Sequence, residues 1–111
     1  MPNDPELARV RQLNDEARMY LTDGKVLFTR GVAALPEADQ AAILERVCTF
    51  DDFAPANDPY GEHDFGAFEH NGHRIFWKID YYDRDERFGS PDPADPRVTR
   101  RVLTIMLAGE Y

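Results

Sequence analysis

The chain has only one cysteine and one serine among 111 residues, and these scarcities exclude two kinds of chemistry. The lone thiol, Cys48, has no second cysteine with which to form an internal disulfide or a cysteine-based metal site. The single serine, Ser90, has no histidine near it in the sequence, so a Ser–His nucleophile is not indicated. Cys48 falls on the apolar face of a predicted helix, where we interpret it as a small core residue. The sequence therefore predicts no catalytic nucleophile, no metal ligands and no cofactor.

Long apolar runs are also missing. No stretch approaches the roughly 18 apolar residues that cross a membrane. The polar start, MPNDPELARV, lacks the basic and then apolar pattern of a signal peptide. We therefore expect a cytoplasmic protein that does not bind membranes.

Positive charge is scarce in the middle of the chain. Residues 51–95 contain twelve Asp and Glu against four Lys and Arg, so this segment alone accounts for the net charge of −8. A nucleic-acid-binding protein needs a basic surface to neutralise phosphates. Direct binding of DNA or RNA is therefore not expected.

The first thirty residues predict a helix followed by a strand. Asn3-Asp4-Pro5-Glu6 combines a capping residue, a proline at the first helical position and an acid near the positive end of the helix dipole. Asp23-Gly24 is expected to end this helix, with Gly24 in the left-handed conformation. Residues 25–29 are β-branched and aromatic enough to form a strand, which Arg30-Gly31 closes.

Asn71-Gly72 lies between two alternating segments, which is the strongest short signal for a β-hairpin, here over residues 65–82. A two-residue turn pairs His70 with His73 and, at the far end, His63 with Asp80. One face is apolar and should be core, with Gly66 leaving room for Trp77. The other face mixes aromatic and charged side chains, so we expect a helix or a partner to cover it. Its members are His63, Phe65, Glu69, Arg74, Phe76, Lys78, Asp80 and Tyr82.

Two further helices are predicted, one from about Pro36 to Phe50 and one beginning at Asp95-Pro96. The apolar face of the last helix would hold Val98, Val102, Leu103, Ile105 and Met106. All elements together predict a single α+β domain, residues 1–111, in the order α-β-α-β-β-α. About three strands would form a small antiparallel sheet packed with three helices.

Several long motifs of the chain are shared with one family. They include LNDEAR, GVAALPEADQAAIL, FDDFAPANDPYGEHDFG, FWKIDYYD and SPDPADPRVTRRVLTIMLAGEY. The chain resembles a family of small bacterial proteins, catalogued only as a domain of unknown function and often found on plasmids and mobile elements. The resemblance covers nearly everything from Arg11 to Tyr111. It implies a cytoplasmic accessory protein, with a possible place in the conflict between mobile DNA and its host, and it assigns no catalytic or binding residues.

The preferred hypothesis is a non-enzymatic, acidic protein-interaction module. In its sharpest form it inhibits a host nucleic-acid-binding defence complex, of the anti-CRISPR or anti-restriction kind. Carboxylates on a rigid surface can occupy a basic channel, and aromatic side chains among them can anchor the contact. The partner would be a protein with a basic surface. The expected protein-binding residues are Asp58, Tyr60, Glu62, Phe76, Asp80, Tyr82, Asp83, Asp85 and Glu86.

Two alternatives stay open. A small hydrolase or metal-dependent enzyme could be centred on His63, Asp64 and Asp80, because a carboxylate facing an imidazole can orient a general base or a metal ligand. The same residues could instead form a structural cross-strand pair and fix turns. The second alternative is an operon-encoded, antitoxin-like partner protein, which would bind a cognate neighbour rather than a host target.

Overall fold

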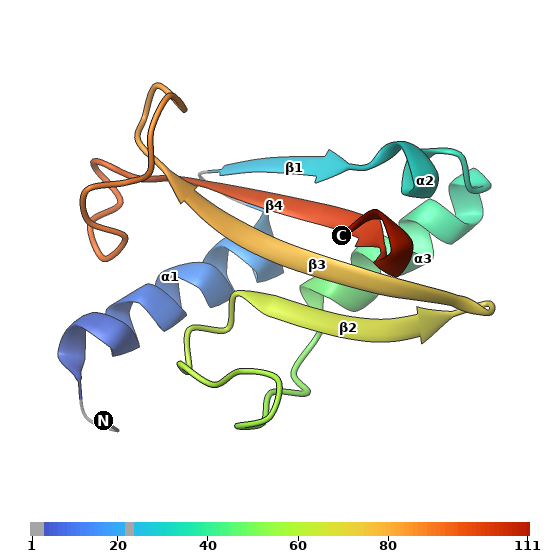
Figure 1. Ribbon diagram of the computed structural model, residues 1–111, viewed down its shortest axis with the longest axis horizontal. Helices are drawn as coiled ribbons and strands as arrows, with labels where there is room; N and C mark the ends of the chain where they lie inside the picture. Colours follow the sequence, from blue (N-terminus) through green and yellow to red (C-terminus); the bar gives the residue numbers. More distant parts are fainter. Residues whose placement is uncertain (1–3, 22–23) are drawn as a thin grey trace.

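The computed structural model describes residues 4–21 and 24–111, which contain four strands in one mixed sheet. The strand order is β1-β4-β3-β2; β1 is parallel to β4, and the other pairs are antiparallel. Figure 1 shows the arrangement. The elements are α1 (Pro5–Tyr20), β1 (Gly24–Phe28), α2 (Arg30–Ala33), α3 (Glu37–Cys48), β2 (Phe65–His70), β3 (His73–Tyr82), β4 (Arg100–Leu107) and the 3₁₀ helix η1 (Ala108–Glu110).

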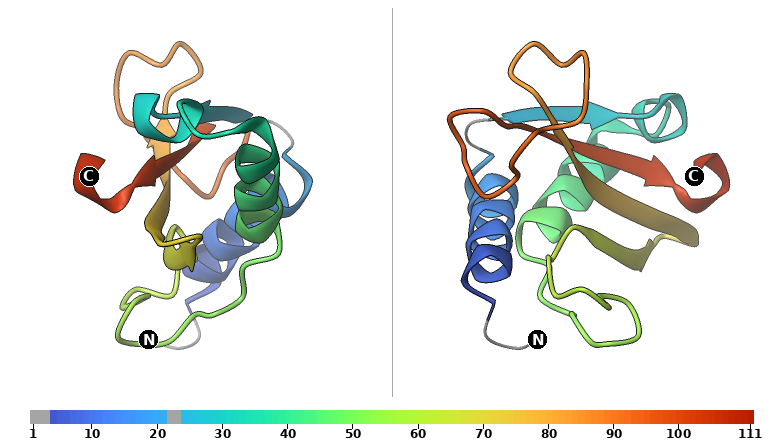
Figure 2. Two further views of the ribbon diagram at one scale, coloured as in Figure 1. Left: turned by 90° about the vertical axis from the view of Figure 1, so that its right-hand side faces the viewer. Right: turned by 60° about the vertical axis from the view of Figure 1, so that its left-hand side comes forward.

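The two long helices, α1 and α3, lie on the same face of the sheet, as the views in Figure 2 show. The core lies between them and the sheet. Its buried members are Val32, Ile43, Val47, Phe68, Ile75, Trp77, Ile79, Leu103 and Ile105. Removing this apolar surface from water is the main source of the fold's stability. No helix in the described parts of the chain is long and apolar enough to cross a membrane.

The hairpin register is confirmed over β2, residues 65–70. Phe65 lies opposite Lys78 and His70 opposite His73, and Asn71 and Gly72 both have the positive φ that the tight turn requires. Trp77 is completely buried and packs directly over Gly66, where any Cβ would overlap the indole. The apolar hairpin face is therefore the core face, as predicted.

The predicted last helix is wrong, because residues 100–107 form strand β4. This strand lies between β1 and β3, and both of its faces are buried: Val102 and Met106 on one face are as buried as Leu103 and Ile105 on the other. Its sequence is therefore apolar at nearly every position instead of alternating. Such a run also fits helical spacing, and periodicity alone cannot separate the two. The β-branched Val102, Thr104 and Ile105 favour the strand. The sheet is therefore four-stranded and mixed, in the order α-β-α-β-β-β, rather than a three-stranded antiparallel sheet.

The boundaries near β1 also differ from the prediction. Asp4 caps α1 by accepting hydrogen bonds from the backbone of Glu6 and Leu7, while Asn3 lies outside the described residues. The left-handed residue after α1 is Leu21, with φ of 53°, and Gly24 instead begins β1. Asp23 also lies outside the described residues. The strand β1 ends at Phe28 instead of Thr29, and Arg30 begins the short helix α2.

The mixed face of the hairpin points away from α1 and α3, and we call it the helix-free face. The C-terminal end of the chain lies over part of it. The ring of Tyr111 approaches Phe65 and Phe76, with centroid distances of 5.9 and 5.6 Å. A helix or a partner was expected over this face; among the described residues, η1 and Tyr111 cover one end of it.

Candidate functional site

Both acidic loops lie at one end of the sheet. Residues 51–64 lead into β2, and residues 83–99 follow β3. Because these two strands are antiparallel, their loops leave from the same end (Figure 1). The two loops occupy opposite corners of this end, with the first residues of β2 between them. We call this region the acidic end.

Four carboxylates gather where β2 begins: Asp58, Glu62, Asp64 and Asp80. The pKa of Asp64 is raised, first by partial burial and then by the negative charges of Glu62, Asp58 and Asp80. Each of these neighbours disfavours the ionised form of Asp64. The acidic end therefore holds mutually repelling charges at neutral pH.

His63 lies beside this group but does not face Asp80, so the predicted cross-strand pair is wrong. The strand ladder stops at Asp64, whose carbonyl accepts the amide of Ile79, and His63 then turns away with φ of 56°. Its Nδ1 lies 2.9 Å from Oδ1 of Asp15, and its Nε2 lies 3.5 Å from Oδ2 of Asp58. Asp80 instead pairs with Lys78, at 2.8 Å.

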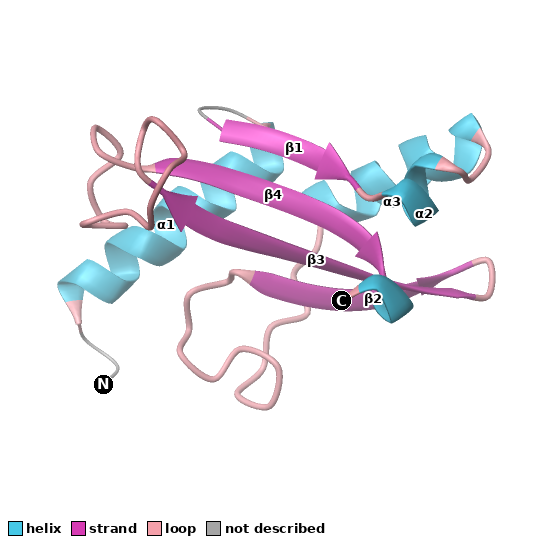
Figure 3. Ribbon diagram, turned by 45° about the horizontal axis from the view of Figure 1, so that its top comes forward, coloured by secondary structure: helices cyan, strands magenta, loops and turns pink. Residues whose placement is uncertain are grey.

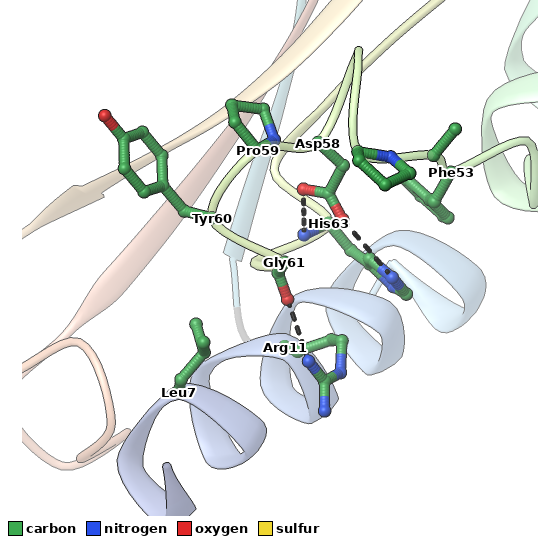
Figure 4. Close-up of a pocket in the computed structure, with 10 residues that line it drawn as sticks. Leu7, Arg11, Phe53, Asp58, Pro59, Tyr60, Gly61 and His63 are labelled. Atoms are coloured by element: carbon green, nitrogen blue, oxygen red, sulfur yellow. Dashed lines mark hydrogen bonds and ion pairs between the residues drawn. The ribbon is translucent and has the colours of Figure 1, made fainter. Parts of the chain in front are cut away.

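The ring of His63 also stacks on Phe53. The two rings are 3.8 Å apart between centroids and tilted by 4°. One carboxylate oxygen of Asp58 accepts the backbone amide of His63, so Asp58 fixes the turn as well as facing the ring (Figure 4). The imidazole is held on three sides by α1, by the loop and by an aromatic ring.

An open hollow of about 470 Å³ lies in front of His63, within the size range of small-ligand pockets. Figure 4 shows that the loop and the first half of α1 form its walls. Arg11 spans it by donating a hydrogen bond to the carbonyl of Gly61 at 3.0 Å. The lining residues are Leu7, Arg11, Phe53, Ala54, Pro55, Asp58, Pro59, Tyr60, Gly61 and His63. Asp64 and Asp80 are not among them, so the hollow does not assemble the predicted His63–Asp64–Asp80 group.

A metal site is not assembled there either. Within residues 4–21 and 24–111, no group of three or more His, Cys, Asp or Glu side chains could hold a metal ion. At the other end of the hairpin, His70 Nε2 lies 2.8 Å from Asp39 of α3 and ties the hairpin to that helix.

A buried polar network behind the acidic end was missed by the sequence analysis. Asn14 of α1 is fully buried, and its Nδ2 donates to the carbonyl of Glu62 and to the Tyr81 hydroxyl at 2.9 and 2.7 Å. Its Oδ1 accepts from Nε of Arg101 at 2.6 Å. The Tyr81 hydroxyl donates to Glu62 at 2.7 Å. Burial, with the Glu62 carboxylate beside it, raises the pKa of Tyr81 well above its usual range.

Arg18, one helical turn after Asn14, was missed as well. Its side chain is buried, and one guanidinium nitrogen donates to the carbonyls of Val47 and Phe50 at 2.9 and 2.8 Å. It thereby caps the end of α3, where carbonyls lack helical partners. The sequence did contain one signal for this network, namely the three- and four-residue spacing of Arg11, Asn14 and Arg18. The pattern resembles a solvated helix face until the packing is known.

The predicted protein-binding residues divide between the two faces of the sheet. Asp58, Tyr60 and Glu62 belong to the loop beside α1, and the Glu62 carboxylate is turned inward to Tyr81. Phe76, Asp80 and Tyr82 lie on the helix-free face by the alternation of β3. Of these six residues, Tyr60 is the most exposed, at 75%.

The loop after β3 is partly neutralised by cations of the strands β1 and β4. Glu86 lies 2.6 Å from Lys25 and 3.4 Å from Arg100. Asp83 accepts the backbone amide of Arg87, while Asp85 is exposed. Phe88 on the same loop is 72% exposed, and the sequence analysis did not single it out.

The two scarce nucleophiles do not form a catalytic pair. Cys48 is half-buried at the end of α3, and burial raises its pKa. The Ser90 hydroxyl lies 2.7 Å from that of Thr99 within the loop that precedes β4. The Cys48 thiol is therefore partly packed at the end of a helix, and the Ser90 hydroxyl takes part in a hydrogen bond within a loop.

No curated protein and no solved structure matches the chain. A family model matches residues 28–110, from the last residue of β1 to the last of η1, which is a shorter stretch than the expected Arg11 to Tyr111. The match covers the hairpin, α3, β4 and both acidic loops. The chain belongs to the family described as "Protein of unknown function (DUF3768)".

Proposed function

We propose that the chain is a non-enzymatic interaction module that binds a protein with a basic surface. The observation that carries this proposal is the gathering of Asp58, Glu62 and Asp80 around Asp64. Partial burial first, and these neighbouring negative charges second, raise the pKa of Asp64. A Lys or Arg from a partner would relieve that repulsion on binding. The carboxylates would therefore favour a cationic partner and speed the encounter.

Exposed aromatic residues on both loops support the same function. Tyr60 extends from the loop before β2, and Phe88 from the loop after β3; they are 75% and 72% exposed. Asp51, Asp52 and Asp85 are exposed on these loops. Large aromatic side chains contribute strongly to binding when a partner buries them. The charges would steer the partner, and the rings would anchor it.

The negative charge of the acidic end indicates which class of protein it would bind. Proteins that hold DNA or RNA have surfaces shaped and charged to bind phosphates. Carboxylates on a stiff scaffold can occupy such a surface in place of phosphates. In the sharpest form of the proposal, the chain blocks a host nucleic-acid-binding defence complex. An antitoxin-like role differs only in that the partner would be a cognate neighbour.

The proposal is tested by neutralising one loop. Asp83, Asp85 and Glu86 would be changed together to Asn, Asn and Gln, and binding to the captured partner measured by titration. We expect a weakening of at least about tenfold, since three steering charges are lost. The matched control changes Glu16, Glu37 and Glu45 to Gln, which removes the same charge from the helix side. An unchanged affinity in the first variant, or an equal loss in the control, would overturn the proposal.

The hollow beside His63 is the observation that favours the enzyme alternative. It has a suitable size and contains a histidine held by two carboxylates. Its support is weaker, because Asp64 and Asp80 do not line it. Chemical-shift mapping with zinc would test it: a saturable shift of the His63 ring signals that His63→Gln abolishes would favour this alternative.

A further inference from the structure

The outer edge of the sheet at β1 is apolar and open. In the described residues, β1 pairs with β4 only, so its other edge has no strand beside it (Figure 3). Val26 and Leu27 in its middle are 37% and 45% exposed. Met19, Tyr20 and Leu21, at the end of α1, are 48%, 69% and 39% exposed. We call these five residues the β1 edge patch.

Along this edge, the backbone of β1 presents hydrogen-bonding groups that no other strand of the described residues takes up. In a parallel ladder, alternate residues direct both backbone groups to the same neighbour. The amide of Thr29 donates to the carbonyl of Ile105 at 3.0 Å, so Lys25 and Leu27 also face β4. Gly24, Val26 and Phe28 therefore face outward. An open, apolar edge strand is a template for another strand, and natural proteins usually blunt such edges.

We propose that the β1 edge pairs antiparallel with the β1 edge of a second copy of this chain, around Val26. The two sheets would then form one continuous eight-stranded sheet. A twofold axis at Val26 places the same patch on both copies, so each exposed apolar residue meets the other copy's patch. Lys25 would lie opposite the partner's Leu27, and Gly24 opposite the partner's Phe28.

Charge complementarity favours a second copy as the occupant. The start of β1 is held next to the acidic loop 83–90, because Lys25 pairs with Glu86 at 2.6 Å. Asp85 is exposed on that loop. The end of β1 leads directly to Arg30, which is also exposed. Antiparallel pairing brings Arg30 of each copy toward the acidic loop of the other, so two attractive contacts form at once.

A basic partner fits this patch poorly. The five residues of the patch carry no carboxylate, whereas the carboxylates around Asp64 lie at β2 and β3. The two proposed contacts share the loop 83–90, through Asp85. Sedimentation of the purified chain tests the dimer without any basic partner, so the two proposals can fail independently.

The first test is sedimentation velocity of the purified full chain over a range of concentrations. We expect a reversible dimer. Val26→Pro should shift the chain to monomer, because proline removes an amide that faces the second copy. The hydrogen bonds between β1 and β4 stay intact. Val26→Ala is the matched control and should keep most of the dimer. A wild-type chain that stays monomeric at every concentration would overturn the proposal, whether or not another protein's strand binds the edge.

Charge reversal gives a second test that does not rely on proline. Arg30→Glu and Asp85→Arg should each weaken the dimer by about three- to tenfold, since each change acts twice in a twofold dimer. The double variant should restore the wild-type affinity. Arg9→Glu, on the exposed side of α1, is the matched control and should leave the dimer unchanged. Failure of the double variant to recover would contradict this pairing.

Disulfide trapping tests the register. In a Cys48→Ala background, Val26→Cys places each new thiol opposite its own copy, at a Cα separation of about 5.5 Å that a disulfide can span. Mild oxidation should give a covalent dimer. His73→Cys, at the exposed hairpin turn, should remain monomeric. Equal cross-linking of both variants would show random collision and would overturn the register.

Discussion

His63 Nδ1 lies 2.9 Å from Asp15 Oδ1, which joins the loop before β2 to the middle of α1. Asp15 also accepts from Arg18 at 3.2 Å, and Arg18 caps α3. One carboxylate thus connects the acidic end to both long helices. The shape of the acidic end therefore depends on buried contacts of α1, and these contacts can be tested one at a time.

His63 is expected to contribute stability in spite of its backbone conformation. His63→Ala should lower the free energy of unfolding by about 2 kcal/mol, through loss of the Phe53 stack and the carboxylate contacts. His63→Gly should recover about 1 kcal/mol of this, because glycine adopts a φ of 56° without strain. Urea denaturation measures both. Equal values for the two variants would show that the positive φ carries no cost.

Asn14 should be among the residues most sensitive to substitution on α1. Asn14→Ala leaves the Arg101 guanidinium, the Tyr81 hydroxyl and the Glu62 carbonyl without the partner they share. We expect a loss of about 3 kcal/mol in the free energy of unfolding. Gln12→Ala, on the exposed side of the same helix, should cost less than about 0.5 kcal/mol. Similar losses in the two variants would contradict the buried network.

Gly66 is required by the indole that covers it. Gly66→Ala should destabilise the protein by about 3 kcal/mol and shift the Trp77 fluorescence, because the new methyl group overlaps the ring. Gly109→Ala, where an added Cβ meets nothing within 4 Å, is the control and should be nearly neutral. An unshifted emission spectrum in the first variant would mean that the indole does not pack on Gly66.

The partial burial of Asp64, together with its neighbouring carboxylates, predicts a pH dependence with a definite sign. A folded-state pKa raised above the unfolded value makes ionised Asp64 a destabilising group. The penalty is absent below the unfolded pKa and complete above the folded pKa. Asp64→Asn should therefore stabilise the protein at pH 7, and the gain should disappear as the pH falls below about 3.8.

Asp39 provides the control of opposite sign. The His70 hydrogen bond lowers the pKa of Asp39, so its contribution is stabilising above the unfolded pKa and is lost as the pH falls through the folded value. Asp39→Asn should therefore destabilise the protein at pH 7. Unfolding curves collected from pH 3 to 7 measure both variants. A stabilising Asp39→Asn, or a destabilising Asp64→Asn, would contradict these two assignments.

The parts of the fold that follow local rules could be predicted from the sequence. Asn71-Gly72 sets the hairpin register by turn geometry alone, and Gly66 and Trp77 then meet by alternation. The strand β4 could not be distinguished from a helix, because its apolar run reflects burial on both faces of the strand. Its central place in the sheet depends on a parallel pairing of residues 24–28 with residues 101–105, which no local signal indicates.

The candidate site was harder to predict for the same reason. The charge of residues 51–95 is visible in the composition, and the topology places both loops at one end. The partners of His63 are not visible, because a positive φ at one residue redirects its side chain from Asp80 to Asp15 and Asp58. Asn14 and Arg18 resemble surface residues until α1 is placed on the sheet.

The central claim is that the acidic end binds a basic protein, and the salt dependence of capture tests it most directly. The tagged chain would be incubated with a cell lysate at low and at high salt, and the retained proteins would be identified by mass spectrometry. Dissolved salt weakens the attraction between exposed charges. The claim therefore predicts that a nucleic-acid-binding protein is retained at low salt and released at high salt. A partner retained equally at both, or no retained partner at either, would contradict it.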